Sequence, residues 1–209
     1  MSSADSDAKH VVRSGYDATA ESYLSDRPRA AADVAALSEL TGRVNTGGTV
    51  LDLGCGAGVP VTAHLQKAAY HVVGIDFSMT QLRLATENVS TPLAQADMSA
   101  LPFRGASFDG AVAYYSIIHV PRDEHAAIVD EIRRVLVPGG HALLVLGAND
   151  LPADLDESSW LGTPMYWSHF DAETNLALLS EAGFDVEWRA LVPDPMGHGE
   201  HLFALVASR

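Results

Sequence analysis

Between residues 49 and 146 the sequence alternates short apolar runs with segments of helical periodicity. Strands that alternate with helices of about 10 to 15 residues are typical of a doubly wound α/β fold, in which the sheet is mostly parallel. The strands that we expect are 49–53, 72–75, 92–96, 108–115 and 140–146, and the helices are 60–69, 78–88 and 123–136.

A glycine-rich turn lies where the first of these strands passes into the first helix. It reads Val-Leu-Asp-Leu-Gly-Cys-Gly-Ala-Gly-Val-Pro over residues 50–60, and glycines at such a turn let the backbone approach a nucleotide closely. A dinucleotide fingerprint would need a third glycine at the position of Val59. The carboxylate of Asp52 would repel a pyrophosphate but attract a ligand that carries an ammonium group. The pattern therefore indicates S-adenosylmethionine rather than NAD, and the candidate cofactor residues in it are Asp52, Gly54, Cys55, Gly56 and Gly58.

An acidic residue ends the second expected strand. Asp76 lies 22 positions after Gly54, a spacing at which its carboxylate can accept hydrogen bonds from both ribose hydroxyls of a nucleoside. Phe77, which follows it, offers an apolar face to an adenine ring. Asp76 and Phe77 are therefore further candidates for cofactor binding.

The net charge of the chain limits the kinds of partner that we expect it to bind. The chain has 13 Lys and Arg against 27 Asp and Glu, a formal net charge of -14, which disfavours nucleic acids and anionic membrane surfaces. Its single cysteine, Cys55, excludes an intrachain disulfide and a cysteine-based zinc cluster. The first ten residues do not read as a secretory signal, and no apolar run approaches the roughly 18 residues of a membrane span. We expect an acidic, soluble, cytoplasmic protein.

Several segments together resemble a known family. These are the glycine loop over 50–58, the acidic end of Val73–Asp76, and the stretches Gln95–Phe103, Ser107–His119, Leu136–Gly140 and Gly15–Tyr23. They resemble the motifs of class I S-adenosylmethionine-dependent methyltransferases, in particular the small single-domain bacterial enzymes. The resemblance covers roughly residues 12–147. It implies a Rossmann-like sheet of seven strands in the order 3-2-1-4-5-7-6, with the last strand antiparallel.

The resemblance also implies further roles for individual residues. Asp97 would meet the adenine amino group, Met98 would lend a backbone amide, and the loop that contains Tyr115 would face the methyl group. In the N-terminal helix, Tyr16 and Tyr23 would close over the cofactor. One domain over residues 1–209 is expected, with an N-terminal helical cap (10–45), a cofactor-binding core (46–147) and a substrate-side lid with a closing hairpin (148–209).

Finer boundaries are expected at both ends of the chain. The cap would contain helices over 10–25 and from Pro28 to about Gly42. The lid would begin with an irregular stretch over 148–170, followed by a helix over 171–182 and by strands over 184–191 and 202–206.

The segment after the fourth strand favours a small acceptor. It reads Ala-Tyr-Tyr-Ser over 113–116, whereas methyltransferases that act on amino groups of nucleic acids or on protein glutamine carry an Asn/Asp-Pro-Pro-Tyr/Phe tetrad there. Cys55 lies in the cofactor loop, where it cannot serve as the nucleophile of a cytosine-C5 enzyme. No cluster of metal-ligating residues is evident at the matching positions, so we expect metal independence.

Histidines are the natural base candidates near neutral pH, and His119 lies in the loop beside the expected methyl position. We predict that it is the catalytic base or orients the acceptor. If His119 has neither role, the next candidate base is His169 or His198, and the pair of His198 and His201 supplies too few ligands for a metal site. Aromatic residues crowd the lid, among them Phe170, and the expected acceptor-binding residues are Trp160, Tyr166, Trp167, His169 and His198.

The leading hypothesis is S-adenosylmethionine-dependent methyl transfer to an oxygen or nitrogen atom of a small molecule, by a monomer or homodimer. The alternative is a catalytically silent S-adenosylmethionine-binding sensor or partner subunit. A third hypothesis, an NAD-dependent oxidoreductase, is disfavoured by Val59 and Asp52.

Overall fold

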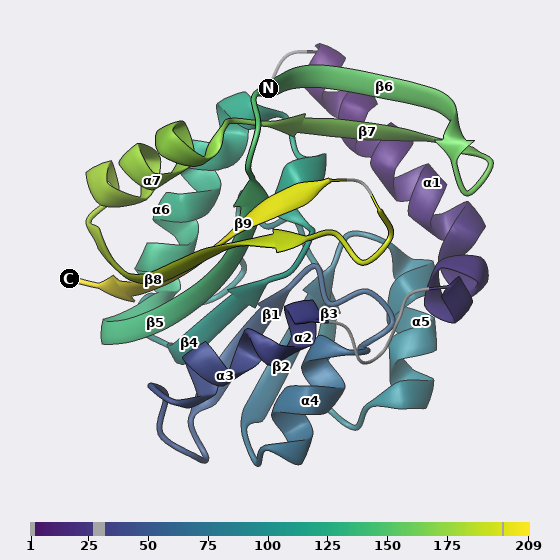
Figure 1. The fold of residues 1–209 in the computed structure, drawn as a ribbon. Coiled ribbons are helices and arrows are strands. Elements are labelled where there is room, and N and C mark those ends of the chain that lie inside the picture. The colour runs from purple at the N-terminus through teal and green to yellow at the C-terminus, as the bar shows by residue number, and fades with distance from the viewer. Residues whose placement is uncertain (1–2, 27–31, 198) are drawn as a thin grey trace.

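The computed structural model describes residues 3–26, 32–197 and 199–209, and a sheet of seven strands lies at its centre (Figure 1). The strand order is β3-β2-β1-β4-β5-β9-β8, and β9 runs antiparallel to both of its neighbours. The strands are β1 (Thr49–Leu53), β2 (His71–Asp76), β3 (Leu93–Gln95), β4 (Phe108–Ala113), β5 (Leu136–Gly147), β8 (Phe184–Pro193) and β9 (Glu200–Ser208).

Strands β6 (Leu151–Trp160) and β7 (Thr163–His169) form a separate two-stranded sheet. Without it, β8 and β9 are the sixth and seventh strands of the large sheet. The order 3-2-1-4-5-7-6 with an antiparallel last strand is therefore confirmed, and so is the doubly wound α/β fold.

Helices cover both faces of the large sheet, and alternate residues of a strand point to opposite faces. In β1, Leu51 belongs to the core cluster beneath α6 and α7, whereas Val50 belongs to the cluster beneath α3 and α4. The helices are α1 (Ser3–Asp26), α2 (Ala32–Ala35), α3 (Leu37–Thr41), α4 (Val61–Lys67), α5 (Met79–Asn88), α6 (His125–Val135) and α7 (Ala172–Glu181), with the 3-10 turns η1 (Ile117–His119) and η2 (Arg122–Glu124). Among the described residues, no helix is both long and apolar enough to cross a membrane.

The expectation of an irregular stretch over 148–170 is wrong, because β6 and β7 pair there as an antiparallel hairpin. Leu161 and Gly162 connect them, and both have positive φ angles of 51° and 78°. This is the combination that a two-residue type I′ turn requires. Pro152 is compatible with strand β6, since both strands of a two-stranded sheet are edges.

Other boundaries also differ. The first helix begins at Ser3 rather than near residue 10, and the expected second one is divided into the short helices α2 and α3, while Pro28 lies outside the described residues. β4 ends at Ala113 because Tyr115 turns the chain with a φ of 51°. β5 starts four residues early, at Leu136, and pairs with Phe108 across an irregularity in the register.

Helix α1 lies along the β6–β7 hairpin (Figure 1), and we call these two elements together the cover. The closest approach is at Gly15, where a Cβ atom would stand 2.7 Å from the carbonyl oxygen of Pro164 and 2.8 Å from Cε of Met165. A glycine at this helical position therefore lets α1 approach β7.

We expect Gly15→Val to lower the free energy of unfolding by about 1–3 kcal/mol, since overpacking forces neighbouring groups apart. Urea denaturation measures the change. The control is Ala18→Val, which places the same side chain on an exposed position of the same helix. Equal stability of the two variants would show that the close approach does not matter.

Candidate active site

A cavity of about 130 Å³ opens at the carboxyl ends of β1, β2 and β4, under helix α1. We call it the first cavity. Every residue predicted for cofactor binding except Gly58 contributes to its wall: Tyr16, Tyr23, Asp52, Gly54, Cys55, Gly56, Asp76, Phe77, Asp97, Met98 and Tyr115.

The glycine loop contributes Gly54 and Gly56 to the wall of this cavity, where the backbone is not covered by a side chain of its own. Gly54 has a φ of +76°, and a Cβ atom on it would stand 2.4 Å from Cβ of Ser116. Only glycine avoids both the strain and the overlap. Gly58 instead faces α5, where a Cβ atom would approach Cγ2 of Val89 to 2.9 Å, so it permits packing of the loop on that helix.

The Asp76 carboxylate connects the glycine loop to α5. Its Oδ2 accepts the N–H of Gly56 and its Oδ1 accepts the N–H of Ser78, each at 2.8 Å. Burial raises the pKa of Asp76 to about 6, although these N–H bonds act in the opposite direction. Ser78 caps α5, as its position before the helix predicts, by accepting the N–H of Gln81.

Asp52 is buried, and its Oδ2 accepts a hydrogen bond of 2.6 Å from the Thr62 hydroxyl in α4. The hydroxyl of a neighbouring helix therefore solvates this acid. It remains in the wall of the first cavity, where it can attract a positively charged group.

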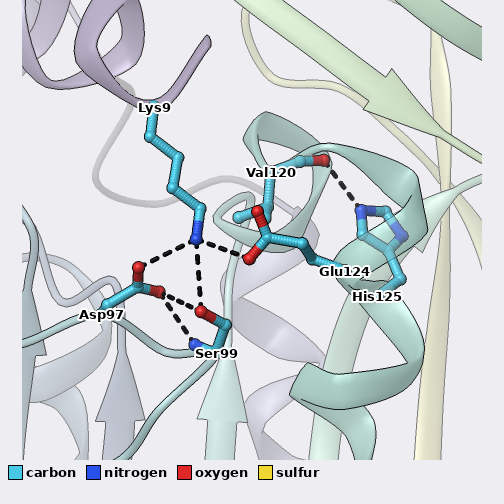
Figure 2. Close-up of polar contacts among 6 residues, drawn as sticks. All are labelled: Lys9, Asp97, Ser99, Val120, Glu124 and His125. Carbon is cyan, nitrogen blue, oxygen red and sulfur yellow. Dashed lines mark hydrogen bonds and ion pairs between the residues drawn. The ribbon is translucent and has the colours of Figure 1, made fainter. Parts of the chain in front are cut away.

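Lys9, which the sequence analysis did not single out, also lines the first cavity. Figure 2 shows its polar contacts. Its ammonium donates to Asp97 Oδ2 at 2.9 Å, Glu124 Oε2 at 2.5 Å and Ser99 Oγ at 3.2 Å. Burial disfavours the charged lysine, but the two carboxylates outweigh this effect and raise its pKa. A signal was present: Lys9, Tyr16 and Tyr23 recur every seven residues, which places them on one face of a helix.

A second cavity, of about 250 Å³, adjoins the first. Four residues line both cavities, namely Tyr16, Tyr23, Tyr115 and His119. The remaining wall of the second cavity is mostly apolar or aromatic. It comes from η1, the β6–β7 hairpin, the β8–β9 turn and the start of β9: Ile118, Leu151, Trp160, Trp167, His169, Asp194, Pro195, Met196 and His201.

His119 is buried between the two cavities, and both of its ring nitrogens are engaged. Nδ1 lies 2.9 Å from the carbonyl oxygen of Tyr166, and Nε2 lies 2.9 Å from the hydroxyl of Tyr16. A carbonyl can only accept, so Nδ1 carries the proton and Nε2 accepts from Tyr16. Burial lowers the pKa of His119 to about 4, so the imidazole is neutral at pH 7.

The predicted acceptor-binding residues divide into three groups. Trp160, Trp167 and His169 line the second cavity. Tyr166 does not line it, and its backbone carbonyl instead holds His119. His198 lies outside the described residues.

Phe170 also lies outside the walls of both cavities. Its ring packs under the guanidinium of Arg122 at 4.9 Å and against the ring of His125 at 5.9 Å. It therefore stabilises the cover from outside instead of forming an acceptor wall.

His201, which lies in β9, has a distinctive environment. Its Nε2 lies 3.1 Å from Oδ2 of Asp194, and its Nδ1 is buried with no hydrogen-bond partner. Its ring meets the ring of Tyr115 edge-on, with centroids 5.1 Å apart. The described residues contain no group of three or more His, Cys, Asp or Glu side chains that could hold a metal ion.

Comparisons with known proteins give a consistent result. A family model described as a methyltransferase domain matches residues 50–140. Methyltransferase GfsG of Streptomyces halstedii is 33% identical over 157 residues, which make up 68% of this chain and 55% of that protein. The chain therefore spans little more than half the length of this curated relative.

Two solved structures illustrate the fold. The 1,6-didemethyltoxoflavin-N1-methyltransferase of Burkholderia thailandensis, solved with 1,6-didemethyltoxoflavin and S-adenosylhomocysteine, has a TM-score of 0.78 at 21% identity, over 100% of this chain and 92% of that one. The [4+2]-cyclase SpnF has a TM-score of 0.70 at 20% identity, over 94% of each chain. At these identities the likeness concerns the fold alone.

The family model covers most of the residues that line the first cavity, and the rest of that wall comes from α1. The matched stretch begins at the glycine loop's strand and ends at the turn within β5, so it contains the loop, Asp76 and Asp97. The strand order agrees with the order that the motifs implied. Residues 50–140 therefore form a methyltransferase domain, and the chain has the fold of the class I S-adenosylmethionine-dependent methyltransferases.

Proposed function

We propose that this protein transfers the methyl group of S-adenosylmethionine to an oxygen or nitrogen atom of a small-molecule acceptor. The observation that carries the proposal is the pair of adjoining cavities. The first has acids and a glycine loop in its wall, the second is aromatic, and Tyr16, Tyr23, Tyr115 and His119 line both. A donor in one and an acceptor in the other would meet at this common wall.

The chemistry of the first cavity suits the proposed cofactor. Asp52 would attract its ammonium group, Asp76 would accept bonds from the ribose hydroxyls, and Phe77 would pack on the adenine. S-adenosylmethionine would supply an electrophilic methyl group that is bonded to a sulfonium sulfur. The leaving group would be the sulfur, as a neutral thioether. The chain has to orient the acceptor and take up its proton.

The second cavity supports a small, flat or apolar acceptor. Trp160 and Trp167 provide aromatic surface, and Leu151 and Met196 add apolar contacts. Such walls would hold the acceptor away from water while few polar groups fix its orientation.

His119 and His201 both line the second cavity, and their different hydrogen bonds favour different roles. His119 already uses both nitrogens within the protein, so we assign it an orienting role through the Tyr16 hydroxyl. In His201, Asp194 holds one nitrogen while the other has no partner. A carboxylate-held imidazole of this kind is suited to accept a proton, so we assign His201 as the base.

The alternative remains a silent S-adenosylmethionine-binding sensor. It would need the first cavity but not the second. The aromatic cavity that adjoins the cofactor cavity favours transfer over sensing.

We expect calorimetric titration to show binding of S-adenosylmethionine and S-adenosylhomocysteine and none of NAD. With a methyl-labelled cofactor, we expect label to enter at least one compound of a panel of hydroxylated and aminated aromatic molecules. NAD binding without S-adenosylmethionine binding would refute the whole proposal. Cofactor binding with no labelled product from the panel or from cell extracts would favour the sensor.

We expect Asp76→Ala to weaken S-adenosylhomocysteine binding by about 1.5–3 kcal/mol, the range for hydrogen bonds to a charged acceptor. In the wild type, affinity should fall as the pH drops below about 6, because protonation removes the carboxylate's charge. Asp76→Asn should lack this pH dependence. Glu87→Ala, at an exposed position of α5, serves as the control. Unchanged affinity in a folded Asp76→Ala variant would show that Asp76 only connects the glycine loop to the start of α5 and does not bind the cofactor.

We expect His201→Ala to lower kcat by roughly 10²–10⁴, the usual contribution of a positioned base, and to leave cofactor affinity unchanged. His119→Ala should cause a smaller loss that falls partly on KM, because it releases the Tyr16 hydroxyl. Turnover of a labelled acceptor measures both, with the exposed His64→Ala as control. If His119→Ala proved the more damaging to kcat, the two assignments would have to be exchanged.

A further inference from the structure

Lys9 joins three parts of the chain that are far apart in sequence. It belongs to α1, Asp97 and Ser99 follow β3, and Glu124 ends η2 (Figure 2). An ammonium group has three N–H donors, and each of them has an acceptor within 3.2 Å. Lys9 therefore has no donor left for a ligand, although it lines the first cavity.

The cluster contains one cation and two carboxylates. The side chains of Lys9, Glu124 and Asp97 are only 9%, 15% and 32% exposed, so solvent and salt screen them less than surface charges. Both carboxylates lie within 2.9 Å of the same nitrogen. Without the ammonium they would repel each other at close range.

The two carboxylates depend on Lys9 to different extents. Oδ1 of Asp97 also accepts from the N–H and the hydroxyl of Ser99, at 2.9 and 2.8 Å. Oε1 of Glu124 is buried with no hydrogen-bond partner, which leaves Oε2 and its bond to Lys9. Removing the lysine would thus leave Glu124 as an uncompensated charge behind the wall of the cavity.

Lys9 connects this charge balance to the cover of the cavity. Asp97 lies in the wall of the first cavity, whereas Glu124 does not. On the same face of α1, Tyr16 reaches His119 at the boundary of the second cavity. The ion cluster therefore fixes the amino-terminal part of the helix whose later turns cover both cavities.

We propose that Lys9 is a positioning residue for cofactor binding: by neutralising Glu124 it keeps the Asp97 carboxylate in the cavity wall and α1 seated over it. The inference rests on the proposed function, in which the first cavity holds S-adenosylmethionine and Asp97 meets the adenine amino group. It assigns Lys9 no contact with the reacting atoms.

A double-mutant cycle tests this charge balance. We expect Lys9→Met, which keeps much of the side chain's length, to raise the Kd for S-adenosylhomocysteine at least tenfold. Glu124→Gln alone should change the Kd little, since Lys9 still has Asp97 and Ser99. In the Lys9→Met/Glu124→Gln variant the Kd should return to within about threefold of the Glu124→Gln value, because the repulsion on Asp97 is gone.

A lysine that only fastened α1 would give a different result. Its loss would not be relieved by Glu124→Gln, which removes a second fastening group, so a Kd for the double variant as high as that of Lys9→Met overturns the inference. A wild-type Kd for Lys9→Met overturns it as well. The control is Lys67→Met, the same change at an exposed position of α4.

Two further readouts keep the outcomes distinct. Circular dichroism and the melting temperature report whether each variant folds. If Lys9→Met does not fold, Lys9→Gln replaces it in the cycle, and we expect the same order of Kd values. Wild-type protein that fails to bind S-adenosylhomocysteine refutes the proposed function and this inference together. Failure of the inference alone requires a wild type that binds.

Discussion

The Asp76 carboxylate fixes the glycine loop, the end of β2 and the start of α5 relative to one another. It accepts one N–H from the loop, at Gly56, and one from Ser78, the residue that caps α5. The Ser78 hydroxyl in turn donates to Asp17 of α1 at 2.5 Å. Hydrogen bonds thus run without interruption from the floor of the first cavity to the helix that covers it, and a shift of this carboxylate would move both.

Three acids line the first cavity of a chain that already carries a net charge of -14. Each is stabilised in a different way: Asp52 by the Thr62 hydroxyl, Asp76 by backbone N–H groups, and Asp97 by Lys9 together with Ser99. Backbone and hydroxyl donors solvate a carboxylate without cancelling its charge. Asp52 and Asp76 therefore keep a negative potential that suits a ligand with ammonium and sulfonium groups. A cationic side chain, Lys9, pairs with Asp97, the acid beside which Glu124 adds a second negative charge.

The sequence predicted the large sheet well because its signals are local. The strands of the alternating region, the glycine loop and the Ser78 cap can each be recognised from a few neighbouring residues, and the family resemblance supplied the strand order. The β6–β7 hairpin was missed although Leu151, Ala153 and Leu155 alternate with polar residues or proline, because Pro152 and the aspartates around it suggested turns. The partners of Lys9 lie 88, 90 and 115 residues away, and no pattern within one sequence reveals contacts of that range.

His119 shows how segments that are far apart in the sequence depend on one another. Its tautomer is set by the Tyr166 carbonyl of β7, and its other nitrogen is thereby directed to Tyr16 of α1. The hairpin thus orients His119, at the boundary between the two cavities, through a backbone carbonyl. Trp160 and Trp167 of the hairpin line the second cavity. The two backbone N–H groups that hold Asp76 belong to Gly56 and Ser78, outside the hairpin, so side-chain changes in β6 and β7 can alter the acceptor side while these bonds to the glycine loop stay as they are.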